Sequence, residues 1–204
     1  MLNNAQNYTF FLKLHQNFSY FCKNFSLMRK LTMPELNRLN VADYHSVTKL
    51  PVIIVLDNIR SMENVGSFFR TADAFRVEAI YLCGITSRPP HREIHKTALG
   101  AEESVGWRYF ATTAEACEHL KNMGYRIFAV EQVEGSIKLD EFSAPEKSAY
   151  IFGNEVDGVD DAVLPYCEQA VEITQMGTKH SLNVSVSAGI VMYHLYENLK
   201  KLIE

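Results

Sequence analysis

The sequence has few cysteines and no long hydrophobic run, and these shortages exclude several classes of protein. Its four cysteines, Cys22, Cys83, Cys117 and Cys167, are too far apart to form a CxxC pair. They suggest neither a zinc site nor a disulfide framework, so we expect no metal and a reducing, cytoplasmic setting. No apolar run approaches the roughly 18 residues that a membrane helix needs, and no membrane partner is expected.

A strong net charge is also missing. The formal net charge is −4 over 204 residues, which argues against a protein that coats nucleic acid by bulk electrostatics. An RNA partner would need a local basic patch on an acidic body. With 47% hydrophobic and 22% charged residues, the composition is that of a globular protein, and one domain is the default.

The first stretch of the chain differs from the rest. Residues 1–33 contain basic residues and scattered aromatics but no acidic residue, and they lack the continuous apolar core of a secretory signal. We expect an N-terminal extension over 1–33 that is poorly ordered or belongs to a mis-assigned start. Met28 opens MRKLTMPELNRL, which resembles a natural start, so residues 1–27 need not be part of the native protein. The domain proper is expected over 34–204.

From Pro34 onward, short apolar runs alternate with helical patterns. Pro34, Leu36, Leu39, Val41 and Tyr44 suggest a short amphipathic helix. The spacing then predicts strands at 51–58, 78–84, 105–110, 125–131, 149–155 and 169–174. Helices are predicted at 64–75, 91–100, 113–123, 159–165 and 181–200. This alternation predicts an α/β fold with a mostly parallel sheet, helices on both faces, and ligands at the carboxyl ends of the strands.

The first polar segment follows the strand predicted at 51–58. Asn64 is a natural helix cap, and Gly66 allows close backbone approach at the first turn. Arg70 lies six residues further along and could reach back to the strand-end cleft. The alternative is that Asn64 only caps the helix and that Arg70 forms a surface ion pair with Asp73 or Glu63.

The second polar segment, Phe152-Gly153-Asn154-Glu155-Val156-Asp157-Gly158, follows an apolar strand directly. Gly153 would let a ligand approach the backbone, and Glu155 is held at the strand tip. The segment lacks the middle glycine of a dinucleotide fingerprint and the ligand pattern of a calcium loop. The alternative is a tight turn whose glutamate is solvated.

The third polar segment, around Ser181-Leu182-Asn183-Val184-Ser185, places small and polar residues where an ordinary core helix would place leucine. Ser181 is predicted to cap a helix over 181–200, whose positive end favours anions. GTKHS is similar to a P-loop but lacks its Gly-Lys-Ser order. A close backbone approach or a ligand site explains so many small residues better than a plain helix does.

Taken together, the three segments resemble the motifs of the SpoU/TrmH RNA ribose methyltransferases, N-x-G-x-x-x-R-x-A, F-G-x-E-x-x-G and S-L-N-V-S-V-x-x-A-x. The match covers about residues 28–200. The resemblance implies transfer of a methyl group from S-adenosylmethionine to a ribose 2′-hydroxyl of RNA. It also implies a C-terminal deep trefoil knot and a homodimer in which each active site is completed by the partner subunit.

The resemblance also implies roles for individual residues. Carried over by position, the catalytic positions are Asn64, Arg70, Glu155, Ser181 and Asn183, and the cofactor positions are Gly153, Ile173, Met176 and Leu182. Family proposals give the base role to the arginine, although a guanidinium pKa above about 12 makes that demanding. The alternative is that Arg70 clamps a phosphate while Glu155 or solvent takes the proton. Gln175 stands where the family often has proline.

RNA contact requires cations near the cleft. The candidates in the predicted strand-end loops are Arg60, Arg88, His91, Arg92, Lys96, Lys179 and His180. His91 and His95 have the i, i+4 spacing of a metal pair, but no third ligand is evident, so no metal is expected. For Arg88 and Arg92, a solvated surface is as good an interpretation as RNA contact.

Three alternatives compete with this hypothesis. A non-catalytic RNA-binding module of the same fold is disfavoured because the catalytic positions are intact. A doubly wound nucleotide-binding enzyme would need a glycine-rich turn after the strand at 51–58, and IRSMENVG does not supply one. A methyltransferase acting on rRNA is the third, but such relatives often carry a longer N-terminal RNA-binding domain, so we expect tRNA.

Overall fold

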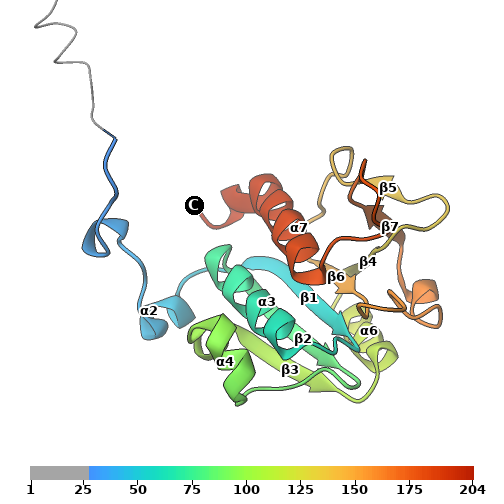
Figure 1. The fold of residues 1–204 in the computed structure, drawn as a ribbon, viewed down its shortest axis with the longest axis horizontal. Helices are drawn as coiled ribbons and strands as arrows, with labels where there is room; N and C mark the ends of the chain where they lie inside the picture. The colour runs from blue at the N-terminus through green and yellow to red at the C-terminus, as the bar shows by residue number, and fades with distance from the viewer. Residues whose placement is uncertain (1–27) are drawn as a thin grey trace, which may run out of the picture. The chain divides into compact units, whose positions relative to one another are not determined.

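The computed structural model describes residues 28–204, in which residues 40–204 form one compact unit (Figure 1). The predicted extension over 1–33 and Cys22 lie largely outside the described residues. Residues 28–39 belong to a separate unit, in which a 3₁₀ turn, η1 (Pro34–Leu36), is followed by Asn37 in the left-handed conformation (φ 47°). That conformation ends the turn, so the single helix predicted from Pro34 to Tyr44 is wrong.

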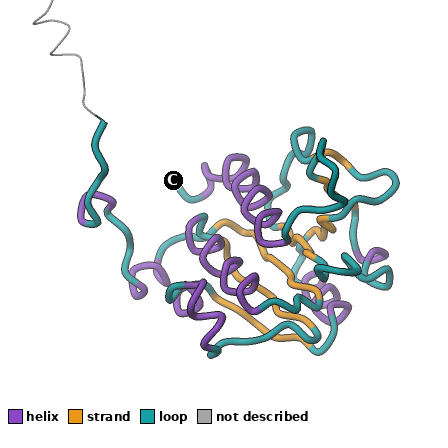
Figure 2. Tube along the Cα trace, viewed as in Figure 1, coloured by secondary structure: helices purple, strands orange, loops and turns teal. Residues whose placement is uncertain are grey.

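The compact unit is built on a seven-stranded sheet in the order β3-β2-β1-β6-β4-β7-β5, and every pair of neighbours is parallel. The strands lie together as one layer of the unit (Figure 2). The strands are β1 (Leu50–Asp57), β2 (Val77–Cys83), β3 (Gly106–Phe110), β4 (Arg126–Val130), β5 (Ile137–Lys138), β6 (Ser148–Phe152) and β7 (Gln169–Glu172). The predicted mostly parallel α/β sheet is therefore confirmed. Because all strands run the same way, their polar carboxyl ends share one edge of the sheet.

Helices cover both faces of this sheet. On one face lie α3 (Met62–Ala74), α4 (Arg92–Ala98) and α7 (Val184–Leu199), and α6 (Thr113–Asn122) lies on the other (Figure 1). Two hydrophobic clusters, one on each face, correspond to these layers. Shorter elements complete the compact unit: α2 (Val41–Ser46), α5 (Ala101–Ser104), η2 (Leu164–Tyr166) and η3 (Lys200–Leu202).

The central strand β1 shows why the sheet forms. Residues 52–57 are all buried, since β1 lies between β2 and β6 and has helices on both faces. Cys83 and Cys117 are buried, and burial raises the pKa of both thiols to about 12. These two cysteines are therefore small core residues without reactive thiolates. No helix among residues 28–204 is long and apolar enough to cross a bilayer.

Two predicted helix starts and one predicted helix are wrong. Ser61 caps α3, because its hydroxyl accepts from the Asn64 amide, and Asn64 lies inside the helix. Asn183 caps α7, and the predicted cap Ser181 lies outside the helix. The predicted helix at 159–165 is reduced to turns and η2, where Pro165 interrupts the amide ladder.

Candidate functional site

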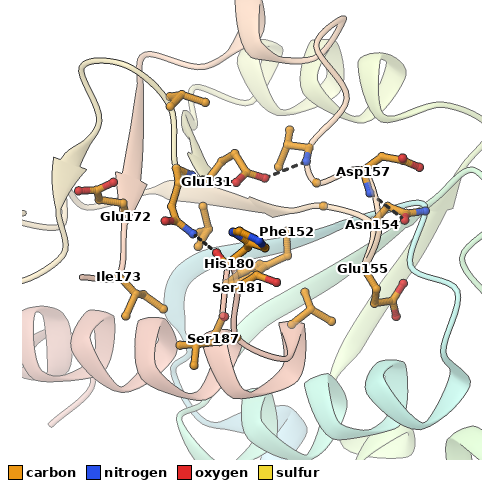
Figure 3. A pocket seen from close by; sticks show the side chains of 18 of the residues that line it. Glu131, Phe152, Asn154, Glu155, Asp157, Glu172, Ile173, His180, Ser181 and Ser187 are labelled. Atoms are coloured by element: carbon orange, nitrogen blue, oxygen red, sulfur yellow. Dashed lines mark hydrogen bonds between the residues drawn. The ribbon is translucent and has the colours of Figure 1, made fainter. Parts of the chain in front are cut away.

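A cavity of about 670 Å³ opens at the carboxyl edge of the sheet, beyond β4, β6 and β7 (Figure 3). Its walls come from three loops that follow these strands and from the first turn of α7. The lining includes Val130, Glu131, Gln132, Gly153, Glu155, Asp157, Asp161, Glu172, Ile173, Gln175, His180, Ser181, Leu182, Asn183 and Ser187. Two of the three polar segments seen in the sequence therefore line one cavity, and the segment around Asn64 joins it through hydrogen bonds.

Three side chains from the three polar segments form a continuous hydrogen-bonded chain. Asn183 Nδ2 donates to Asn64 Oδ1 at 3.3 Å, and Asn64 Nδ2 donates to Glu155 Oε1 at 2.9 Å. Asn64 is buried at the centre of this chain, with 9% of its surface exposed. An amide suits this position because it donates on one side and accepts on the other. We call Asn64, Glu155 and Asn183 the Asn–Glu–Asn chain.

Asn183 also organises the start of α7. Its Oδ1 accepts from the backbone amides of Ser185 at 2.9 Å and Val186 at 3.4 Å, as a helix cap does. The same oxygen accepts from the Ser185 hydroxyl at 2.6 Å. The Asn183 amide nitrogen thereby points toward Asn64, so the cap orients the side chain as well as the helix.

The Glu155 carboxylate accepts hydrogen bonds on both oxygens. Oε2 accepts from the Arg60 amide at 3.0 Å, and Oε1 accepts from the Ser61 amide at 3.1 Å as well as from Asn64. Partial burial works to raise the pKa of Glu155, but these hydrogen bonds outweigh it, and the pKa lies below its ordinary value. Glu155 is exposed at the cavity, but both of its carboxylate oxygens are held by hydrogen bonds, and the lowered pKa disfavours its protonation.

The turn that presents Glu155 requires its two glycines. A side chain on Gly153 would meet the backbone of Gly158 and Val159 at 2.0 and 2.1 Å, and Gly158 has φ +75°. Asn154 closes the turn, since its Oδ1 accepts from the Val156 amide and its Nδ2 donates to the Asn58 carbonyl. The close approach predicted at Gly153 is thus made first by the chain's own backbone, which also lines the cavity.

Asp57 is an organising residue that the sequence reasoning missed. It ends β1, is 1% exposed, and accepts from the Thr113 hydroxyl, the Asn58 amide at 2.9 Å and the Asp160 backbone amide at 3.0 Å. Its carboxylate joins the loops after β1, β3 and β6. The signal was an acidic residue placed directly after a fully apolar strand, where a charge is buried only with partners. Glu131 and Gln132 were also missed, since two polar residues after a strand carry no distinctive pattern.

The predicted cofactor positions divide into two groups. Gly153, Ile173 and Leu182 line the cavity, whereas Met176 is 95% exposed and is not part of its wall. Ser181 lines the cavity as well, although it does not cap α7. Gln175, which stands at the position often occupied by proline, also belongs to the wall.

Arg70 does not lie in this cavity. It is exposed on α3 and makes no hydrogen bond or ion pair with any residue between 28 and 204. Neither the expected contact with the cleft nor an ion pair with Asp73 or Glu63 is formed. A guanidinium left unpaired on an exposed helix surface is available to a ligand or to another chain.

The candidate RNA-contacting cations follow the carboxyl ends of three strands. Arg60 follows β1, the group from Arg88 to Lys96 follows β2, and Lys179 and His180 follow β7, all of them exposed. Arg88 lies over the Tyr109 ring, 4.1 Å from its centroid. His91 caps α4 through Nδ1. No cluster of three metal-ligating side chains occurs among residues 28–204.

The protein combines a parallel α/β sheet with the Asn–Glu–Asn chain, which joins three motifs that lie far apart in the sequence. These features place it in one family of α/β proteins. The SpoU rRNA Methylase family matches residues 51–193, and the chain belongs to this family. It is 32% identical over 157 residues to the 23S rRNA (guanosine-2'-O-)-methyltransferase RlmB of Neisseria meningitidis serogroup B. That alignment covers 76% of this chain and 62% of the relative, so the chain spans less than two thirds of the relative's length.

Solved structures show the same fold. The A. aeolicus TrmH/SpoU tRNA modifying enzyme superimposes with a TM-score of 0.71 at 22% identity, over 79% of this chain and 82% of that one. The AdoMet-bound rRNA methyltransferase from Sinorhizobium meliloti superimposes with a TM-score of 0.68 at 23% identity, over 75% of this chain and 61% of that one.

Proposed function

We propose that this protein transfers a methyl group from S-adenosylmethionine to a ribose 2′-hydroxyl of RNA. The observation that carries the proposal is the Asn–Glu–Asn chain, which brings the three family motifs together beside one cavity. Membership of the SpoU rRNA Methylase family supports it, as do the activities for which the similar proteins are named.

The cavity fits S-adenosylmethionine in size and in charge. Its volume of about 670 Å³ lies within the range of small-molecule sites, roughly 300–1,000 Å³. Carboxylates from Glu131, Glu172 and Asp161 are part of its lining, and no lysine or arginine between residues 28 and 204 lines it. Such a wall suits a ligand that carries a sulfonium and an ammonium. Val130, Ile173 and Leu182 supply apolar surface for the adenine.

When bound, S-adenosylmethionine supplies an activated methyl group, so the protein's task is to align the acceptor and to handle its proton. Alignment of two reactants contributes about 7–11 kcal/mol at best. In our proposal Glu155 positions residues and does not act as the base, because both of its oxygens already accept hydrogen bonds. Arg70 is assigned to the RNA phosphate beside the acceptor ribose as a cation, and the hydroxyl proton passes to solvent.

The position of Arg70 outside its own cavity supports a homodimer in which the partner subunit supplies this residue. The outer surface of α7 also favours a dimer. Val186, Ile190 and Tyr193 are 51%, 39% and 54% exposed on a helix whose other face is already buried in the core. An apolar strip beside the cavity is the type of surface that a second copy of the chain would bury.

We propose RNA as the substrate and tRNA as the first candidate. Exposed cations at the carboxyl edge offer phosphate contacts, and Arg88 stacked on Tyr109 offers a planar surface to a base. The similar proteins are named for either RNA, since one is a 23S rRNA methyltransferase and another a tRNA modifying enzyme. The tRNA enzyme is covered over more of its length.

The C-terminal segment is also proposed to form the deep trefoil knot implied by the motifs. Two contacts between this segment and the stretch between β4 and β6 support the proposal. Gln132 Nε2 donates to the His180 carbonyl at 3.0 Å, and His194 Nε2 lies 2.8 Å from the Phe142 carbonyl.

Methyl transfer can be tested directly. The purified protein is incubated with tritium-labelled S-adenosylmethionine and bulk RNA, and tRNA and rRNA fractions are counted separately. Calorimetric titration with S-adenosylmethionine accompanies the assay. Cofactor binding together with labelled RNA is expected. RNA binding without cofactor binding or label would instead identify a non-catalytic module of the same fold. Ribose methylation mapping in cells lacking the gene then identifies the nucleotide.

A further inference from the structure

The segment 173–182, which joins β7 to α7, forms one wall of the cavity, and of its residues only Ile173, at its start, packs against the hydrophobic core. Ile173, Gln175, His180, Ser181 and Leu182 from this segment line the cavity. Within residues 28–204, a single hydrogen bond reaches the segment: Gln132 Nε2 donates to the His180 carbonyl at 3.0 Å (Figure 3). Beyond Ile173, the position of this wall therefore depends on the hydrogen bond from Gln132.

The residue before Gln132 fixes where this donor lies. Glu131 Oε1 accepts from the backbone amide of Gln132 at 2.8 Å, and Oε2 accepts from the backbone amide of Val159 at 3.1 Å. The Glu131 amide itself donates to the Val171 carbonyl at 3.2 Å. Gly158 leaves room for this carboxylate, because a Cβ there would lie 2.4 Å from Oε2. Glu131 therefore joins the loops after β4 and β6, and it positions Gln132 between them and β7.

We propose that Gln132 is a latch that holds the segment 173–182 against the cavity, with Glu131 as its brace. The inference rests on the proposed function, since the ligand of the cavity is taken to be S-adenosylmethionine. Both are positioning residues, which act by keeping the wall in place and not by touching the methyl group. Without this hydrogen bond, part of the free energy of cofactor binding is used to order the wall. Loss of the latch therefore weakens cofactor affinity more than it slows methyl transfer.

Two substitutions test the latch by chemistry and not by size. Gln132→Met keeps most of the shape and removes the NH₂ donor to the His180 carbonyl without adding a charge to the cavity wall. Glu131→Gln keeps one acceptor and turns an NH₂ group toward one of two backbone N–H donors. Glu134→Gln is the matched control, since Glu134 is exposed in the same loop and forms no hydrogen bond with the described residues.

The experiment measures three quantities on the full chain. Calorimetry gives the dissociation constants of S-adenosylmethionine and S-adenosylhomocysteine, steady-state kinetics gives KM and kcat, and hydrogen exchange of the unliganded protein reports on 173–182. For Gln132→Met we expect about tenfold weaker binding of both ligands, the equivalent of about 1.4 kcal/mol. KM for the cofactor should rise with kcat largely kept, and 173–182 should exchange faster. Glu134→Gln should match wild type.

Two results would overturn the latch. One is cofactor binding by Gln132→Met within twofold of wild type, and the other is unchanged exchange of 173–182 in the unliganded variant. A fall in kcat with KM unchanged would also contradict a positioning role. If wild type itself binds neither ligand, the proposed function fails, and the hydrogen exchange of the unliganded proteins still decides whether Gln132 holds the segment.

Discussion

The Glu155 carboxylate gives the sharpest test of how the site is built. In Glu155→Gln, the amide oxygen can take the place of Oε1 and keep the bonds from Ser61 and Asn64. The new NH₂ group then faces the Arg60 amide, so a donor meets a donor where Oε2 accepted at 3.0 Å. The substitution therefore loses one charge-assisted hydrogen bond and leaves one amide unpaired.

The expected size follows from this count. A hydrogen bond to a charged group contributes about 1.5–3 kcal/mol, and partial exposure of Glu155 favours the lower part of that range. For a chain of this length, 2 kcal/mol corresponds to a fall in Tm of about 4–8 °C. Asp157→Asn is the matched control, because it removes one charge from the same turn and its carboxylate accepts no hydrogen bond from the described residues.

The pH dependence of this loss has a defined sign. The pKa of Glu155 is lower in the folded protein than its ordinary value of 4.5. A lowered pKa stabilises the fold above pH 4.5, and that stability is lost as the pH falls through the folded-state value. The Tm difference between wild type and Glu155→Gln should be complete at pH 7 and should close in acid below pH 4.5.

The assay also separates positioning from base catalysis. Thermal melts are followed from pH 7 to pH 3, and methyl transfer is followed from pH 5 to pH 9. We expect the rate to fall while the shape of the pH–rate profile stays that of wild type. A wild-type acid limb that disappears in Glu155→Gln would refute this reasoning and make Glu155 the base. An unchanged Tm at pH 7 would refute the hydrogen-bond count.

Three further predictions concern other parts of the chain. Arg70→Ala should leave Tm within about 1 °C of wild type, since the side chain has no partner among the described residues, and should abolish most methyl transfer; retained activity in the tritium assay would contradict its role. Gly66→Ala should cost about 1–3 kcal/mol in chemical denaturation, because its Cβ would lie 2.0 Å from Thr97 Oγ1 and 2.3 Å from the Ile94 carbonyl oxygen; an unchanged free energy of unfolding would contradict this close packing. Ile190→Asp should give a monomer in analytical ultracentrifugation, and a persistent dimer would exclude the α7 surface as the interface.

Most of the fold could be predicted from the sequence because the strands are buried on both faces. A run such as residues 52–56 has no polar position, which only a central strand between two helical layers permits. The two-residue strand β5 was not predicted, since Ile137 and Lys138 are exposed and carry no periodic signal.

The helix starts were predicted less well, because several residues nearby could cap. Ser61 and Asn64 are both capping residues, and so are Ser181 and Asn183. At α3 the asparagine side chain is engaged by Glu155 and Asn183, which leaves the cap to Ser61. Such a choice depends on contacts between segments that lie far apart in the sequence.

The three motifs identified the segments that form the site, but not the side-chain positions and hydrogen bonds within it. Motif positions alone suggested that Arg70 shares a pocket with Glu155, whereas the side chain lies outside the cavity. The exposure of Met176 was equally hidden, since a methionine in a loop has no burial pattern. Gln132 carries no sequence signal at all, because its role depends on a single carbonyl 48 residues away.

The large sequence separations within the Asn–Glu–Asn chain determine when the site can assemble during synthesis. Its links span 91 and 119 residues, so no fragment that ends before Asn183 can complete it. During synthesis the first two polar segments emerge well before the third, and the site stays unassembled until the last helix docks. Fraying of that helix in the finished protein would disconnect Asn64 while the sheet stays intact, so loss of activity on heating should precede loss of secondary structure.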